Sequence, residues 1–493
     1  MISQSPQPGS RFGSILADVP ASLVVFLVAL PLSLGIAVAS GATPQSGLIA
    51  ATIGGILVGL LGGAPLQVSG PAAGLTVMVL GYVTKFGLPS LGIIVLVAGG
   101  LQILGGLLRL ARAAMAISPA VLHAMLAGIG VLITLGQVHV VFGSKPKGSA
   151  IENVIALPGV VMDANLNALL IGSATMAVLL LWPRVAKKVP FLPGSLVGIL
   201  VGTGISMLLP GEFPRVAIEG SLFDSLHLPV LGNNTLTDLV LAGVALALVA
   251  SAESLLCAVA TDQLHSGRRA NLDRELFAQG VGNVACGLVG GLPITGVIVR
   301  SSANIAAGGK TRWSATLHGV WMAIFVVLCA GLLSKVPMAS LAALLIHVGV
   351  KLVKVKEIKK VAAFGELLVY VVTIGGVVFI NLLWGIGIGF ALALIRLLKR
   401  VSAIEVTAID QGQDVVVHVR GNLNFLAVPE LTARLRELPP RRNLVIQFAL
   451  EGVDHAAIEA VRGWRIGYEK EGGSVQKPSL DAIWRDMTGK PAA

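Results

Sequence analysis

Two charged residues in this sequence are placed where they could act on a small ligand. Glu253 and Arg300 lie within or beside long apolar stretches, where ionisable side chains are costly and are therefore candidates for a function. A carboxyl group held away from water can bind a proton, and in its ionised form it can bind a cation. A guanidinium group adds positive potential for an anion. The structural alternatives are a carboxyl group bonded to a neighbouring helix and an arginine paired within the scaffold.

Two segments rich in glycine, 63–70 and 290–296, could bring backbone groups to the same ligand. Each contains a proline and leads into an apolar stretch, 70–84 or 294–307, that is too short to cross a bilayer alone. We interpret both stretches as half-helices that follow a short strand. Non-helical backbone is tolerated in a membrane only beside protein or a water-filled cavity. Small residues near the start of each half-helix let a ligand approach the backbone closely: Ser69, Gly70, Ala72, Ala73, Gly74, Thr295 and Gly296.

The composition predicts that helices in a membrane position these groups. Hydrophobic residues make up 55% of the 493 residues and charged residues only 12%, whereas soluble proteins contain about 25% charged residues. A full span needs about 20 apolar residues. Together with the two half-helices, the full spans predict an all-α polytopic membrane protein with 14 transmembrane segments. We expect the full spans at 19–40, 46–63, 90–110, 120–142, 165–183, 193–210, 236–262, 275–290, 314–334, 337–350, 365–381 and 384–400.

The spacing of these features indicates an internal repeat. Pro71 and Thr295, at the two half-helices, lie about 224 residues apart, and Pro31 and Glu253, in the first span of each half, lie about 222 apart. Seven segments therefore repeat, and because seven is odd, the second half enters the membrane from the opposite side. Such a 7+7 inverted repeat is typical of secondary transporters. Chance spacing of segments rich in glycine is the alternative.

The basic residues predict the orientation. With the N-terminus in the cytoplasm, the loops predicted inside contain 15 Lys and Arg residues and those predicted outside contain 5, as the positive-inside rule requires. We expect a multi-pass protein of the plasma or inner membrane with both termini in the cytoplasm. The net charge of +11 arises from short basic runs between apolar segments, which argues against nucleic-acid binding.

In this orientation both half-helices begin near the midplane, and their N-termini face one point. Each N-terminus has unpaired N–H groups and about half a positive charge, which together predict a site for a small anion. The sequence contains no GxSxG, HExxH or nucleotide-binding motif, so we do not expect an enzyme. We expect no cofactor or metal beyond a coupling proton or Na⁺.

The domain organisation changes after Arg400. Runs rich in β-branched residues predict strands at 415–419 and 444–448, and helices are predicted at 430–438 and 456–467. This alternation indicates a small α/β domain. The expected organisation is therefore an N-terminal cytoplasmic segment at 1–18, a transport domain at 19–400 with repeats at about 19–210 and 236–400, the α/β domain at 404–475, and a polar tail at 476–493.

Several motifs of this chain resemble the SulP family of inorganic anion transporters. They are Val28–Ser33, Val68–Gly74, Glu275–Gly280, Gly290–Arg300 and Ala307–Thr311, and the resemblance extends over about residues 15–480. Segments Gly421–Phe425 and Val453–Ala457 resemble the STAS domain that usually accompanies this family in the cytoplasm.

The resemblance implies how such a protein works. It implies a core domain that moves against a gate domain in an elevator-like way, usually within a homodimer. The anion would sit between the third and tenth segments, and the first and eighth would line its site. Carried onto this chain, the implied anion site consists of Pro31, Leu32, Ser33, Ser69, Gly70, Ala72, Ala73, Thr295, Gly296 and Val297, with Glu253 beside it. Arg300 adds positive potential.

The resemblance also bears on the substrate and the coupling ion. Many sulfate-type members have Gln where this chain has Leu32, and Val28–Leu32 looks more like the bicarbonate-transporting branch. The sodium-dependent bicarbonate members have Asp and Thr where this chain has Glu253 and Cys257. Cysteine is a poor sodium ligand beside oxygen donors, which favours a proton as the coupling ion. The alternatives are sulfate, another oxyanion or a dicarboxylate as substrate, an anion channel, a nucleobase permease, or a membrane-tethered signalling protein.

Overall fold

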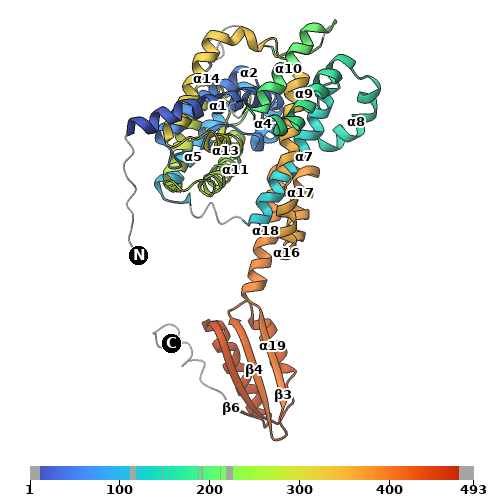
Figure 1. Cartoon of the computed structure of the whole chain (residues 1–493). Helices are drawn as coiled ribbons and strands as arrows, with labels where there is room; N and C mark the ends of the chain where they lie inside the picture. The colour runs from blue at the N-terminus through green and yellow to red at the C-terminus, as the bar shows by residue number, and fades with distance from the viewer. Residues whose placement is uncertain are drawn as a thin grey trace. The chain divides into compact units, whose positions relative to one another are not determined.

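The structure is a computed structural model that describes residues 11–111, 118–147, 149–186, 188–189, 192–210, 213–217 and 226–476, except for the side chains of 11–17, 329, 330 and 383. Residues 1–10 of the predicted segment 1–18 and all but the first residue of the predicted tail 476–493 lie outside these residues. Residues 11–18 of the predicted N-terminal segment belong to the first helix, which begins at Arg11. The chain forms two compact units, Met1–Phe390 and Ala391–Ala493, and the boundary falls within helix α18 (Leu382–Val401) (Figure 1).

The helices of the first predicted repeat appear in the expected order, and the first half-helix is preceded by a short strand. These elements are α1 (Arg11–Ala39), α2 (Pro44–Ile53), a π-helical turn η1 (Gly54–Val58), α3 (Gly59–Leu61), β1 (Ser69–Pro71), a 3-10 turn η2 (Ala73–Leu75), α4 (Thr76–Phe86), α5 (Leu88–Leu107), α7 (Pro119–Val141), α8 (Ala150–Met162), α9 (Leu166–Val185) and α10 (Gly194–Leu208).

The second predicted repeat has the same succession and ends in α18. Its elements are α11 (Leu236–Asp262), α12 (Leu272–Val289), β2 (Ile294–Gly296), α13 (Ile298–Ala306), α14 (Arg312–Leu333), α15 (Met338–Leu352), α16 (Val355–Ala363) and α17 (Leu367–Phe379). In the described part of the chain, seven helical stretches are long and apolar enough to cross a membrane, and five shorter apolar helices accompany them. The number of 14 crossings stays a prediction.

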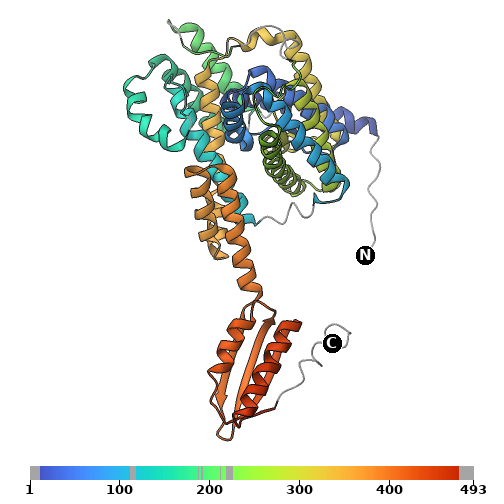
Figure 2. The ribbon, with the colours of Figure 1, turned by 180° about the vertical axis from the view of Figure 1, so that it is seen from behind.

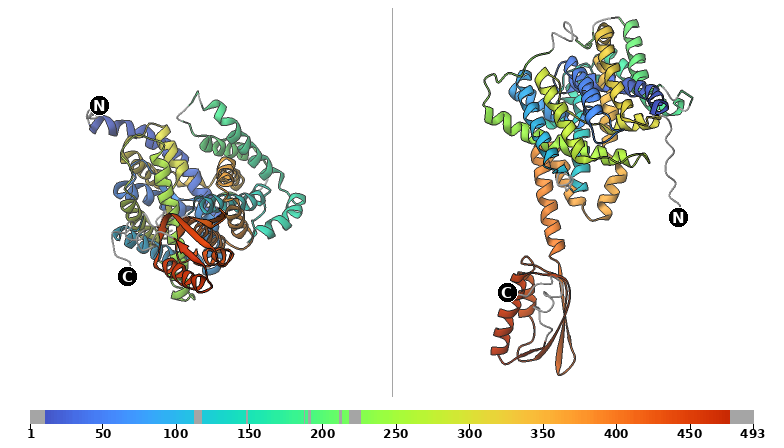
Figure 3. Two further views of the ribbon diagram at one scale, coloured as in Figure 1. Left: turned by 90° about the horizontal axis from the view of Figure 1, so that it is seen from below. Right: turned by 90° about the vertical axis from the view of Figure 1, so that its left-hand side faces the viewer.

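The packing of the helices follows the proposed repeat. Helix α1 packs on α14, and its counterpart α11 packs on α5; likewise α2 contacts α14, while α12 contacts α5. In a second group of helices, α9 contacts α15, while α7 contacts α17. If each helix in these contacts is replaced by its counterpart in the other repeat, the result is again a contact found in the structure. Figures 2 and 3 show the membrane unit from other sides.

The two strands β1 and β2 confirm that each half-helix follows a short extended segment. They pair antiparallel, with Ser69 opposite Gly296, Gly70 opposite Thr295 and Pro71 opposite Ile294. All residues of both strands are buried. Because the strands run in opposite directions, the half-helices that follow them begin at opposite ends of one small sheet.

Two helices of the membrane unit were not predicted. Helix α8 has 13 residues with Pro158 inside, and α16 has nine residues with three lysines. A search for about 20 apolar residues misses α8 because it is short, and α16 because it is short and polar. They occupy equivalent places in the two repeats, after α7 and after α15.

The C-terminal unit contains a four-stranded sheet in the order β3-β4-β5-β6. Its elements are β3 (Ile404–Asp410), β4 (Asp414–Leu423), α19 (Val428–Arg436), β5 (Asn443–Val453), α20 (His455–Lys470) and β6 (Ser474–Gln476). β3 is antiparallel to β4, and the other neighbours are parallel. Both helices lie on one face of the sheet (Figures 2 and 3). The predicted strands and helices of this domain are confirmed; β3 and β6 were not predicted.

Candidate functional site

The half-helices differ from many other helices in how they begin. Side chains of Thr43, Asn165, Thr235 and Asn271 accept hydrogen bonds from backbone N–H groups at the starts of α2, α9, α11 and α12. No side chain caps η2, α4 or α13, which follow Ala72, Leu75 and Val297. The first N–H groups of a helix have no partner within the helix. The two uncapped starts therefore offer donors to a ligand.

Arg300 contacts the small sheet directly. It lies one turn into α13, and its side chain is fully buried. Its Nη2 donates to Ser33 Oγ at 3.1 Å and to the carbonyl of Pro71 at 3.1 Å. Its Nε and Nη1 have no hydrogen-bond partner, and no carboxylate of the described residues forms an ion pair with it. A buried charge without a counter-charge is costly, and a bound anion would remove that cost.

Gly70 lets Arg300 reach this position. A Cβ atom at Gly70 would lie 2.1 Å from Nη1 of Arg300, so any other residue there would displace the guanidinium group. The predicted site residues Ser33, Gly70 and Arg300 are therefore in direct contact.

Glu253 lies at the other half-helix. Thr295, opposite Gly70 in the sheet, lies beside its carboxyl group, and Oε2 has no hydrogen-bond partner. A Cβ atom at Gly74, within η2, would be 2.4 Å from Oε1 of Glu253. The carboxyl group is thus packed against the uncapped start of the first half-helix. Glu253 is partly accessible, as are Ala73 and Val297.

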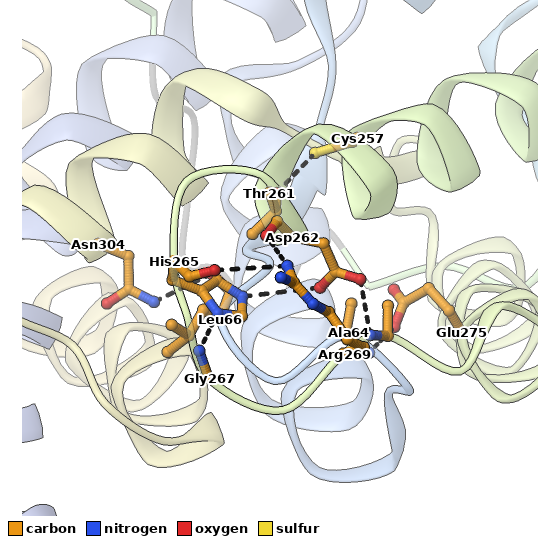
Figure 4. Close-up of polar contacts among 11 residues, drawn as sticks. Ala64, Leu66, Cys257, Thr261, Asp262, His265, Gly267, Arg269, Glu275 and Asn304 are labelled. Atoms are coloured by element: carbon orange, nitrogen blue, oxygen red, sulfur yellow. Dashed lines mark hydrogen bonds and ion pairs between the residues drawn. The ribbon is translucent and has the colours of Figure 1, made fainter. Parts of the chain in front are cut away.

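Two predicted site residues lie further from the sheet. Leu32 is buried in an apolar cluster with Leu48, Ala51 and Leu344, and no polar contact connects it with Arg300 or Glu253. Cys257 lies one turn after Glu253, and its Sγ is 3.8 Å from the hydroxyl oxygens of Thr261 and Ser301; Figure 4 shows its contact with Thr261.

The remaining predicted residues belong to the frame of the sheet. Ser69 and Gly296 face one another in it, Ala72 is buried beside it, and the N–H group of Val297 donates to the carbonyl of Val68 at 2.9 Å. Pro31 lies within α1, in the turn that also carries Ser33. The sequence predicted no separate role for each of these residues. In the structure most of them contribute backbone contacts.

Three polar side chains that hold the sheet were not predicted. Gln279 donates from Nε2 to Ser69 Oγ at 2.6 Å. Asn283 accepts from the N–H group of Ile294 at 2.8 Å and donates to its carbonyl at 3.0 Å. Ser254 Oγ accepts from the N–H group of Gly296 at 3.2 Å. Gln279 and Asn283 lie four residues apart on α12, and this spacing of polar residues in an apolar helix was the available signal.

Glu275 begins the same polar stripe and closes the loop before β1. Its carboxylate accepts from the N–H groups of Gly63 and Ala64 at 2.8 and 2.9 Å and from Nε2 of Gln67 and Gln279 at 2.9 Å each. A buried carboxylate with four donors is fully engaged. Glu275 is therefore a positioning residue for the first strand.

Comparisons with known proteins show which family the chain resembles. Residues 15–374 match the Sulfate permease family. The chain is 30% identical over 398 residues to the putative sulfate transporter YvdB of Bacillus subtilis, an alignment that covers 78% of this chain and 74% of that protein. It is 29% identical over 417 residues to the bicarbonate transporter BicA of Synechocystis sp., with coverage of 82% and 73%.

Solved structures show the same fold. The transmembrane domain of a cyanobacterial bicarbonate transporter, BicA, superposes with a TM-score of 0.68 at 27% identity and covers 78% of this chain and 98% of that domain. The structure of SLC26A9 has a TM-score of 0.83 at 16% identity, with coverage of 97% and 87%, and this likeness concerns the fold alone.

Proposed function

This chain belongs to the sulfate permease family, a family of membrane transporters and not of enzymes, and from that premise we propose that it is a secondary active transporter of a small inorganic anion. The observation that carries the proposal is the pair of uncapped half-helix starts beside a buried arginine with two unpartnered N–H groups. Helix N-termini and arginine both bind oxyanions through charge-assisted hydrogen bonds.

The anion binds between the starts of η2 and α13. Nε and Nη1 of Arg300 each have free N–H groups that point in different directions, and the anion contacts one of these two nitrogens. Ser33 and the carbonyl of Pro71 hold the third nitrogen and so fix the guanidinium plane. Backbone N–H groups of Ala73 and of the residues that follow Val297 complete the shell. These two residues are partly accessible, which gives an anion a way to reach the backbone.

Bicarbonate is the proposed substrate, because Val28–Leu32 resembles the bicarbonate-transporting branch and a relative named as a bicarbonate transporter is 29% identical. Sulfate is the second candidate, since the relative named as a putative sulfate transporter is 30% identical. Both anions are small oxyanions whose oxygens accept charge-assisted hydrogen bonds from arginine N–H groups.

Glu253 couples transport to protons in this proposal. Its carboxyl group contacts η2 at Gly74, where the helix dipole also attracts the substrate. An ionised carboxylate and a substrate anion would repel one another and compete for the same donors. Protonation of Glu253 removes this competition, so a proton and an anion bind together. Sodium coupling is less favoured, because the group one turn away is the Cys257 thiol, which is a poor sodium ligand beside oxygen donors.

The mechanism is alternating access by an elevator-like movement in a homodimer in the cell membrane, with both termini in the cytoplasm. The site lies in the helices that pack around α1, α5, α11 and α14, and the other group, around α7 and α15, would serve as the gate. The C-terminal α/β unit serves as a regulatory or dimerising domain of the STAS type.

The proposal is tested by uptake of labelled bicarbonate and labelled sulfate into proteoliposomes, each with and without an inward proton or sodium gradient. Accumulation of bicarbonate driven by the proton gradient is expected. Accumulation of sulfate alone would reassign the substrate, and current at rates above those of a carrier would indicate a channel. If neither anion enters under any gradient, the transport proposal is wrong, and the signalling alternative, in which the C-terminal unit is the active part, takes its place.

A further inference from the structure

Three arginines gather at one end of the membrane unit, away from the candidate anion site. Arg274 Nε donates to the carbonyl of Leu61 at 2.8 Å, and Arg312 Nη1 donates to the carbonyl of Leu60 at 2.6 Å. These are consecutive carbonyls at the C-terminal end of α3, which packs against both α12 and α14. The two guanidinium groups therefore lie side by side. Arg268 is the third arginine of the group, since it lies close enough for its charge to act on Arg312.

The loop between α11 and α12 presents Arg268 to this pair. Asp262 accepts a hydrogen bond from the N–H group of Ala270 at 2.8 Å, and Nη1 of Arg269 donates to the backbone carbonyls of Asp262 and His265, as Figure 4 shows. Arg269 is thus turned into its own loop. Arg268 is exposed and forms no hydrogen bond or ion pair with the described residues.

The nearby carboxylates of the described residues form no ion pair with the three arginines. Glu275 is the one carboxylate that acts on Arg312, and its oxygens are engaged by four N–H donors in the loop before β1 and on α12. Asp273 accepts from the N–H group of Ala111 at 3.2 Å, and Asp262 is bonded within its loop. No carboxylate therefore lies directly between the three guanidinium groups, and an anion placed there would be attracted by all three.

Large apolar side chains border the arginines. Leu60, Leu61 and Trp313 are 40%, 37% and 41% exposed, and they adjoin the residues that carry the guanidinium contacts. In a membrane protein such side chains face lipid, and Trp is enriched at the level of the lipid headgroups. The cluster thus combines cations with an apolar border, whereas a site for a soluble anion needs only the cations.

We propose that Arg268, Arg274 and Arg312 form a binding site for the phosphate of an anionic phospholipid headgroup, with the acyl chains against Leu60, Leu61 and Trp313. Arginine binds phosphate through two parallel N–H donors, and basic pockets between transmembrane helices bind anionic headgroups. Free inorganic phosphate has the same chemistry but makes no use of the apolar border. The site is separate from the candidate anion site and does not depend on the transported substrate.

The test is a titration of the purified full-length chain in detergent with phosphatidylglycerol and with phosphatidylcholine, and bound lipid is counted by native mass spectrometry. The phosphatidylglycerol should bind at least about tenfold more tightly. Each cation near a membrane surface contributes about 1 kcal/mol, so Arg268→Gln should weaken this binding about fivefold, and Arg274→Gln with Arg312→Gln roughly 25-fold.

The variants include controls for folding and for unspecific charge. Arg268→Gln breaks no hydrogen bond of the described residues. Arg274→Lys with Arg312→Lys keeps both charges and should recover most of the affinity. Arg184→Gln removes an exposed arginine at the end of another helix, α9, and should change nothing. Equal binding of the two lipids, unchanged affinity in Arg268→Gln, or displacement of phosphatidylglycerol by low-millimolar inorganic phosphate would each overturn the assignment to a lipid headgroup.

Discussion

The role of Arg300 gives the sharpest test of the candidate anion site. Its Nη2 is occupied by Ser33 and Pro71, while Nε and Nη1 are free. In Arg300→Lys the charge remains and the ammonium group has three donors. Two of them replace the bonds of Nη2, which leaves one donor for the anion instead of the free N–H groups of two nitrogens. A hydrogen bond to a charged group contributes about 1.5–3 kcal/mol, so the KM for bicarbonate should rise roughly 10- to 150-fold.

The assay is initial uptake of labelled bicarbonate into proteoliposomes over a range of concentrations. Arg300→Gln loses the charge and the free donors of Nε and Nη1, so its initial uptake should be lower than that of Arg300→Lys. Arg215→Lys is a matched control, because Arg215 also donates from Nη2 to a backbone carbonyl, that of Ser206, but lies outside the site. If Arg300→Lys melts at the wild-type temperature and its KM stays within about threefold of wild type, the assigned role of Arg300 is wrong.

The other predictions concern coupling, packing and the C-terminal unit. Glu253→Gln keeps the shape of the side chain but cannot exchange a proton, so an inward proton gradient should no longer stimulate uptake; continued stimulation would refute proton coupling. Gly74→Ala places a Cβ 2.4 Å from Oε1 of Glu253 and should impair uptake, whereas Gly81→Ala, with no atom within 4 Å, should not. Asn283→Ala leaves the N–H and C=O groups of one residue of β2 unpaired, which should lower the free energy of unfolding by about 2–6 kcal/mol, measured by denaturation in detergent; a loss below about 1 kcal/mol would contradict its clamping role. Truncation after Arg400 should leave some uptake by the membrane unit, while complete loss with an intact fold would favour the signalling alternative.

Much of the fold could be predicted from the apolar pattern. The predicted spans overlap the helices α1, α5, α7, α9 and α11, because a run of about 20 apolar residues is typical of a helix that crosses a membrane. The half-helices were recognisable from the proline and glycine that precede them. Helices α8 and α16 were missed, since the same search passes over a short helix and a basic one.

The candidate site was predictable in its parts but not in its contacts. The sequence indicated Glu253 and Arg300 as charged residues in apolar surroundings, but not that Arg300 binds Ser33 across 267 positions. It also gave no sign that Asn283 would bind the outer edge of β2. Val297 donates to Val68, and because hydrogen-bonded pairs alternate along an antiparallel ladder, the N–H and C=O groups of Ile294 point away from β1. Asn283 binds both of them there. Such contacts depend on how distant segments pack, so they could not be predicted from the spacing of residues along the chain.

The central claim is that an anion binds between the starts of the two half-helices and contacts Arg300. The most direct measurement is an experimental structure of the purified protein with saturating bicarbonate or sulfate. The account predicts density for the anion within hydrogen-bond distance of Nε or Nη1 of Arg300 and beside the first residues of η2 and α13. An anion bound elsewhere, with those two nitrogens still unpartnered, would contradict it.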